Sequence, residues 1–167
     1  MIRRLLVAVL AAGIPLSMGV GAAAGAAQPP TRTFVAVLSA DEEVPGCASA
    51  TNAARGLAVF HVHDGTVEFK IIANNLPGAI IAAHIHVAPK GVAGAIVQPL
   101  PPTAGAENGV VAQGSFTNAA LVAAIQANAD NYYVNVHTTV CPAGVIRGQL
   151  GDHGAAQQLG DSSNPSN

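Results

Sequence analysis

Residues 56–72 read GLAVFHVHDGTVEFKII, and this stretch decides the fold. Two runs rich in β-branched and aromatic residues flank the pair Asp64-Gly65. Asp-Gly is favoured in two-residue hairpin turns, because both positions need a positive φ that these residues tolerate. The stretch therefore predicts an antiparallel hairpin with strands over 56–63 and 66–72.

The neighbouring sequence predicts further short strands separated by turn residues. Apolar or alternating runs indicate strands over 33–40, 80–87, 110–116, 132–137 and 145–150. Thr117-Asn118 can cap a short helix over 119–126, whereas residues 88–109, rich in glycine and proline, predict an irregular connection. This pattern predicts an all-β fold with one short helix. We expect an antiparallel Greek-key sandwich or barrel, immunoglobulin-like or superoxide-dismutase-like.

The N-terminus has the order of a secretory signal: Arg3 and Arg4, then an apolar run, then small residues up to Ala27. We expect residues 1–27 to be a cleaved signal peptide. An uncleaved membrane anchor needs about 20 apolar residues, and Pro15 with several glycines argues against one.

Removal of the signal leaves roughly 140 residues, which is the usual size of one domain. We expect a linker over 28–32, a single domain over 33–151, and a polar, disordered tail over 152–167. With this organisation the mature protein is exported and extracellular, and no segment inserts into a membrane after cleavage.

Composition excludes several classes of function. Charged residues make up 10% of the chain and the formal net charge is −2, so neither nucleic acid nor anionic lipid is an expected partner. Tryptophan is absent, which argues against a large aromatic binding platform. No motif places a histidine or a carboxylate beside Ser39, Ser49 or Ser115, so a hydrolase triad is not supported.

The chain contains two cysteines, Cys47 and Cys141. An even number of cysteines in an exported protein favours a disulfide over a metal site or a reactive thiol. We predict one structural bridge that closes a loop of nearly the whole domain. For such a loop the chain-entropy relation gives about 4 to 5 kcal/mol of stabilisation.

Four segments of the chain, in their order and spacing, resemble the motifs of a known domain family. They are LSADEEVP (38–45), AHIH (83–86), YVNVHT (133–138) and GVIRGQL (144–150). Together they resemble the CHRD domain, the module named for its repeats in chordin, over nearly all of 33–151. The resemblance implies an extracellular β-sandwich-like domain, found alone in many bacterial exported proteins, with no established enzymatic activity. The motif residues that we single out are Asn135, Thr138, Arg147 and Gln149.

His84, His86 and His137 lie in these segments and have two interpretations. Residues 84 and 86 project from one face of a strand, about 7 Å apart at the backbone, so their rings can reach one ion. If the strand that ends at His137 faces them, three nitrogens form a site suited to zinc or copper. Alternatively, the rings hydrogen-bond backbone carbonyls or neighbours such as Asn135 and Thr138.

The same histidine pattern is similar in part to copper/zinc superoxide dismutase. That enzyme is a β-sandwich whose copper ligands include a His-x-His pair and a histidine at the end of a later strand. No segment of this sequence matches its zinc-binding loop. His61 and His63 form a second His-x-His pair beside a turn and are expected to be solvated, and His153 lies beyond the predicted domain.

Arg147 lies on the predicted last strand and needs a polar partner for its guanidinium. Glu42 or Glu43 is the expected partner in a structural ion pair. A functional alternative is that the arginine guides an anion to a metal.

These observations lead to a main functional hypothesis and an alternative. The main hypothesis is an exported CHRD domain that acts as a non-enzymatic binding or structural module, with an extracellular protein or a small ligand as its partner. It rests on a full motif set without a nucleophile, a phosphate loop or paired catalytic carboxylates. The alternative is a zinc- or copper-binding protein, redox-active if copper is bound, that uses His84, His86 and His137.

Overall fold

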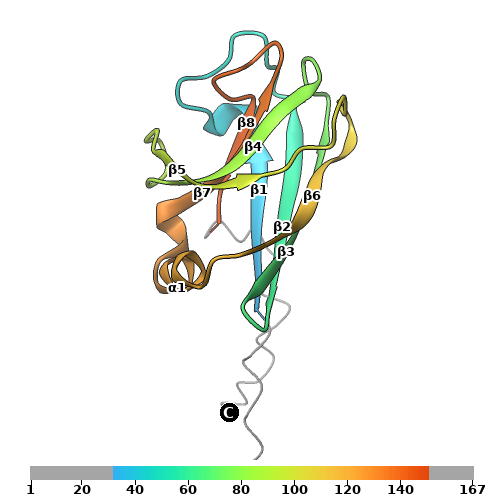
Figure 1. Cartoon of the computed structure of the whole chain (residues 1–167). Helices are drawn as coiled ribbons and strands as arrows, with labels where there is room; N and C mark the ends of the chain where they lie inside the picture. Colours follow the sequence, from blue (N-terminus) through green and yellow to red (C-terminus); the bar gives the residue numbers. More distant parts are fainter. Residues whose placement is uncertain (1–31, 151–167) are drawn as a thin grey trace, which may run out of the picture.

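Eight antiparallel β-strands form a single sheet that curls almost closed in the computed structural model of the chain (Figure 1). The structure describes residues 32–150. The elements are β1 (Arg32–Ser39), η1 (Ala40–Glu42), β2 (Arg55–His63), β3 (Thr66–Asn74), β4 (Ile80–Val87), β5 (Ala95–Leu100), β6 (Gly109–Thr117), α1 (Ala119–Ala127), η2 (Ala129–Asn131), β7 (Tyr132–Thr138) and β8 (Ile146–Gln149). The strand order in the sheet is β5-β4-β7-β8-β1-β2-β3-β6. The predicted antiparallel all-β class with one short helix is therefore confirmed.

Three sequence predictions lie outside the described residues. They are the signal peptide over 1–27, the tail over 152–167 and the position of His153; most of the linker is outside as well. Within 32–150, no helix is both long enough and apolar enough to span a membrane.

The predicted hairpin is present as β2 and β3. His63 pairs with Thr66 in the register, and the two residues between them have positive φ, 47° at Asp64 and 77° at Gly65. Positive φ at both central positions matches the right-handed twist of the flanking strands. The turn therefore fixes the register, and alternate residues of both strands face the interior.

The core lies inside the curled sheet. Phe60 and Phe69 stack there with ring centroids 6.2 Å apart, and Phe69 also contacts Phe116. Helix α1 adds Leu121 and Ile125 to the same apolar cluster. Removal of apolar surface from water contributes about 25 cal/mol per Å², so this cluster is the main source of stability.

Helix α1 begins where the sequence predicts. The side chain of Asn118 accepts a hydrogen bond from the backbone N–H of Leu121 at 3.1 Å, which satisfies one of the free donors of the first turn. The helix lies at one end of the sheet, as Figure 1 shows.

The prediction of an irregular connection over 88–109 is wrong in part, because β5 forms within it. This strand pairs with β4 and lies at an edge of the sheet, with Pro99 opposite His84. An edge strand tolerates proline, since one side of its backbone needs no sheet partner. The glycine and proline content of 88–109 therefore led to the wrong prediction for the residues of β5.

The outer face of β7 and β8 is buried as well as the inner face, and so is the adjoining His86 of β4. On β7, Val134 and Val136 point into the core, but Tyr133, Asn135 and His137 on the opposite face are also buried. Strands normally bury one face in an antiparallel sheet and expose the other. Here the second face is polar and lies beneath connecting segments, which creates a buried polar layer.

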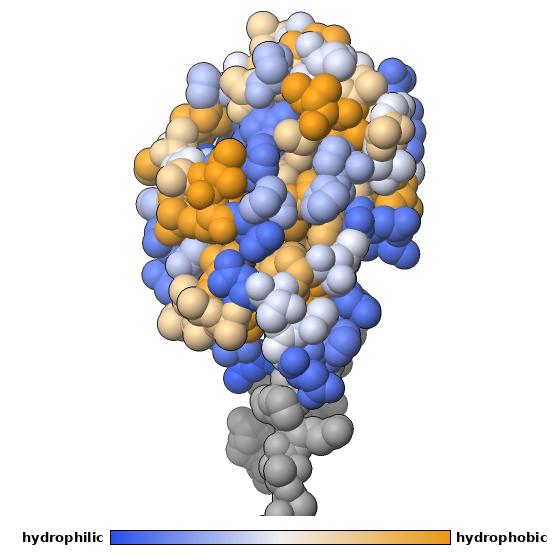
Figure 2. Space-filling model, in the orientation of Figure 1, coloured by the Kyte–Doolittle hydropathy of each residue, from blue (hydrophilic) through white to orange (hydrophobic). Residues whose placement is uncertain are grey.

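Elsewhere the surface carries scattered apolar side chains. Figure 2 shows patches of apolar residues on one face of the molecule, separated by hydrophilic ones. The large exposed apolar residues include Val37, Ile81 and Ile96. Exposed apolar residues that are interrupted in this way are ordinary for the surface of a globular protein.

Candidate metal centre

Pairing of β4 with β7 brings His84, His86 and His137 together in the buried polar layer. In the register, His86 is opposite Tyr133 and His137 is opposite Ala82, so His137 lies diagonally from His84. The Nδ1 atom of His84 lies 3.0 Å from Nε2 of His137. One ligand nitrogen from each of the three rings lies within 4.8 Å of the others. A small adjustment of the rings would let all three contact one ion at the 2.0–2.1 Å typical of zinc–nitrogen bonds.

Backbone carbonyls fix the orientation of two of these rings. His86 Nδ1 lies 2.9 Å from the carbonyl oxygen of Gly94, and His137 Nδ1 lies 3.2 Å from that of Pro142. A carbonyl can only accept, so each Nδ1 carries the proton and each Nε2 keeps its lone pair. Metal-binding histidines in proteins usually donate their second nitrogen in this way.

The Nε2 atom of His86 has no partner in the part of the chain that the structure describes. It is buried and makes no hydrogen bond. A buried lone pair without a donor costs free energy unless something binds it. Its lone pair is therefore available to a proton donor or a metal ion.

Burial keeps the three imidazoles neutral at pH 7. Desolvation lowers the pKa of His137 to about 4, with a further contribution from His84. Desolvation also lowers the pKa of His84 and of His86, and the neighbouring charges of His86 and Arg147, respectively, act in the same direction. Neutral imidazole is the form that binds a metal, so protons do not compete for the cluster at neutral pH.

His84 is the most accessible of the three rings. It is half-buried, whereas His86 and His137 are buried. His84 also lines a groove of about 350 Å³ that runs past Pro99 and Phe116. Solvent and small solutes can therefore approach the cluster from the side of His84.

A second layer of side chains supports His86. The ring of Tyr133 stacks on His86 with centroids 4.7 Å apart and an interplanar angle of 12°. The guanidinium carbon of Arg147 lies 3.5 Å from the centre of the Tyr133 ring. The hydroxyl of Tyr133 accepts a hydrogen bond from the backbone N–H of Gly94, whose carbonyl holds His86. Tyr133 thus orients His86 by stacking and through the loop.

The predicted ion pair of Arg147 with Glu42 or Glu43 is wrong. Arg147 donates instead to the carbonyl oxygens of Pro89 and Val92 and to the side chain of Gln149. Glu42 pairs with Lys90. The reason is geometric: the guanidinium is 99% buried beneath the loop after β4, where backbone carbonyls supply its acceptors.

The other motif residues hold connecting segments. Gln149 donates to the carbonyl oxygens of Ala88 and Asp130, and Thr138 donates to that of Pro77. Asn135 donates to the carboxyl of Glu43 at 3.3 Å. The prediction that Asn135 and Thr138 hydrogen-bond the imidazoles is therefore wrong, while the predicted bonds from imidazole to backbone carbonyls are present.

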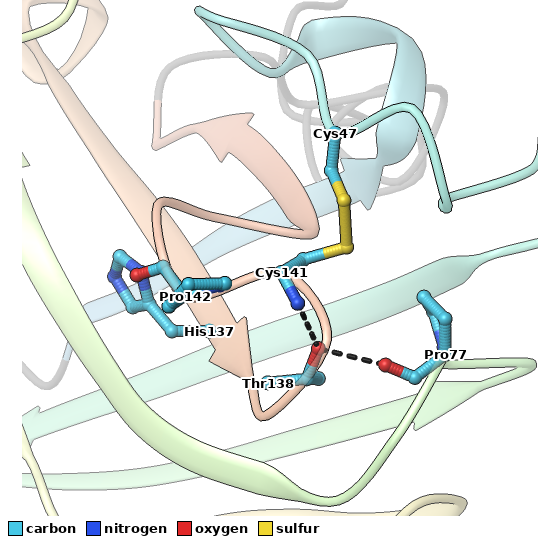
Figure 3. The surroundings of a disulfide bond; sticks show 6 residues. All are labelled: Cys47, Pro77, His137, Thr138, Cys141 and Pro142. Carbon is cyan, nitrogen blue, oxygen red and sulfur yellow. Dashed lines mark hydrogen bonds between the residues drawn. A yellow bond between two sulfur atoms is a disulfide. The ribbon is translucent and has the colours of Figure 1, made fainter.

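The Cys47–Cys141 disulfide is confirmed and lies beside the cluster (Figure 3). Thr138 Oγ1 accepts a hydrogen bond from the backbone N–H of Cys141 and donates to Pro77, as Figure 3 shows. Pro142, which follows Cys141, supplies the carbonyl that holds His137. The bridge therefore anchors the turn that orients a candidate ligand.

The second His-x-His pair does not join the cluster. His61, which is exposed on β2, contacts the hydroxyl of Thr33. His63, which is partly exposed on the same strand, lies 3.4 Å from Glu68. Among residues 32–150, the cluster of His84, His86 and His137 is the one group of metal-ligating side chains that converges.

Sequence reasoning missed Tyr133, Gly94 and the burial of Glu43. Tyr133 could have been found, because it is two residues from Asn135 and shares its strand face. Gly94 carried no recognisable signal. A Cβ at Gly94 would overlap the carbonyl of Val87, so only glycine allows the loop to approach β4 closely enough to bind His86.

The comparisons with known proteins agree with the motif pattern. No curated protein and no solved structure matches the chain. The model of the CHRD domain matches residues 34–150, which includes every strand that forms the cluster and the loops that cover it. CHRD domains are typically extracellular, in keeping with the disulfide. With more than half of its length matched, this chain belongs to the CHRD domain family.

Proposed function

We propose that this CHRD domain is an exported module that binds one zinc or copper ion through His84, His86 and His137. The observation that carries the proposal is the buried, unpartnered Nε2 of His86 within a convergent cluster. This lone pair lies where a metal ion held by the other two rings would meet it, and the Nδ1 of the same ring is already bound to a carbonyl, as is usual for metal-binding histidines. Between the two hypotheses drawn from the sequence, the geometry favours metal binding.

The proposed function needs no enzymatic activity. A three-histidine site can bind and hold an ion without a nucleophile or a catalytic acid. The proposal therefore agrees with a role as an exported, non-enzymatic binding module, and names a metal ion as its ligand. An extracellular protein or small molecule that meets the bound ion would approach past His84, which lines the open groove.

We predict that the purified protein, prepared without a histidine tag, binds one zinc or copper ion per chain. His84→Ala should weaken binding by more than about 100-fold, because even the loss of a residue that only orients a ligand costs about 10- to 100-fold. His84 is the choice for substitution since it is the least buried of the three rings. Elemental analysis and isothermal titration calorimetry measure stoichiometry and affinity.

The matched control is the double variant His61→Ala/His63→Ala, which removes the other His-x-His pair on β2. It should bind the ion as tightly as the unchanged protein. Equal affinity in His84→Ala, or less than one-tenth of an ion per chain in the unchanged protein at saturating metal, would refute the proposal.

A further inference from the structure

A buried positive charge lies behind the candidate metal centre. Strand β7 lies between β4 and β8 in the sheet, so the Tyr133 ring has His86 on one side and Arg147 on the other. The two stacking distances, 4.7 and 3.5 Å, together place the guanidinium carbon within about 8 Å of the His86 ring centre. The hydrogen bonds of Arg147 all end on neutral acceptors.

The side chains that would bind the ion carry no negative charge to offset this arginine. Its three candidate ligands are neutral imidazoles, and no carboxylate or thiolate of residues 32–150 joins their cluster. Glu43 is the carboxyl that interacts electrostatically with Arg147, but it lies too far from the guanidinium to form an ion pair with it. The neighbouring Glu42 pairs with Lys90 instead. Burial raises the pKa of Glu43 to about 7, so it is largely uncharged below that pH.

From this arrangement we propose that Arg147, acting through the Tyr133 ring, makes the three-histidine centre selective for copper(I) over zinc(II) and copper(II). The inference rests on the proposed function. Each additional unit of charge on the ion is repelled by the fixed guanidinium. Three imidazoles also complete a trigonal copper(I) site, whereas zinc would take a water as its fourth ligand.

The size of the electrostatic preference follows from Coulomb's law. A unit charge about 10 Å from the ion, at an effective dielectric constant of about 20, raises the dissociation constant by about tenfold for each unit of charge on the metal. Imidazole ligands without this charge suit both metals. Arg147 is thus a positioning and specificity residue that touches Tyr133 and not the ion.

Arg147→Gln should lower the preference for copper(I) over zinc(II) by about tenfold. The readout is the ratio of the two dissociation constants, measured under anaerobic conditions by competition with chromogenic chelators. Arg147→Lys keeps the charge and should retain most of the preference. The control is Arg55→Gln, which removes an exposed arginine of β2 that pairs with Asp41. This variant should leave the ratio unchanged.

A second variant covers the case in which Arg147→Gln does not fold. At pH 8, Glu43→Gln removes a negative charge that acts on Arg147, so the ratio should move in the opposite direction, toward copper(I). If every folded variant has the ratio of the unchanged protein, the selectivity proposal is overturned. Absence of metal binding in the unchanged protein is a different result, and refutes the proposed function itself.

Discussion

The double variant Cys47→Ala/Cys141→Ala is expected to lose about 4 to 5 kcal/mol of its free energy of unfolding. The bridge joins residues 94 positions apart, so its loss returns a large loop entropy to the unfolded chain. For a domain of this size the total stability is about 5 to 15 kcal/mol, so the loss is a large fraction of it. Urea unfolding of both proteins at pH 7 measures the difference.

The same double variant should also bind metal more weakly. The bridge anchors the turn that carries Pro142, and the carbonyl of Pro142 orients His137. Reduction of the unchanged protein is the matched control, because it opens the bridge without changing any side chain in the core. A stability loss below about 1 kcal/mol would show that the bridge adds little to the fold.

Glu43→Gln is expected to stabilise the protein at pH 8 by about 3 kcal/mol more than at pH 4.5. Glu43 is 7% exposed, and desolvation raises its pKa from 4.5 to about 7, against smaller effects of Asn135 and Arg147. Its Oε1 and the Oδ1 of Asn135 are buried acceptors that meet no donor among residues 32–150. A proton on the carboxyl supplies a donor, and the amide of glutamine does the same at every pH.

The direction of the pH effect follows from proton binding. Between pH 4.5 and 7 the folded protein keeps a proton on Glu43 that the unfolded chain has lost, so stability falls as pH rises through this window. His137 acts oppositely: its folded pKa of about 4 lies below the ordinary histidine value of 6.5, so its contribution to stability rises with pH over that range. The histidine contributions cancel when the two proteins are compared at one pH.

Urea unfolding at pH 4.5, 6 and 8 tests this expectation. The matched control is Glu42→Gln, which removes the adjacent carboxyl that pairs with Lys90 at the surface. A stability difference between Glu43→Gln and the unchanged protein that is constant across the three pH values would contradict a buried, protonated Glu43.

Local features of this fold were predictable from the sequence. The hairpin over β2 and β3 follows from Asp64-Gly65, because a two-residue turn and its flanking alternation are encoded within a short stretch. The cap at Asn118 is equally local. The strand β5 was not predictable, because pairing with β4 and its place at the edge decide its structure despite its proline.

The candidate site was predictable only in outline. His84 and His86 share a strand face by simple alternation, and the motif pattern placed His137 nearby. The carbonyl acceptors of His86 and His137 could not be inferred, since Gly94 and Pro142 lie in loops whose path depends on contacts across the sheet. The partner of Arg147 was mistaken for the same reason.

By itself, the sequence determined the all-β class, the pairing of its two cysteines, Cys47 and Cys141, and the family, because these depend on residue types and on short motifs. It placed His84 and His86 on one strand face, but their convergence with His137 depends on the pairing of β4 with β7. Only the tertiary structure decided that the outer face of β7 and β8, with His86 of β4, is buried. That burial depends on contacts such as Glu43 with Asn135, 92 residues apart, and Arg147 with Pro89, 58 residues apart. Whether a polar side chain is desolvated depends on which distant segment of the chain covers it. Local periodicity does not predict which segment that is.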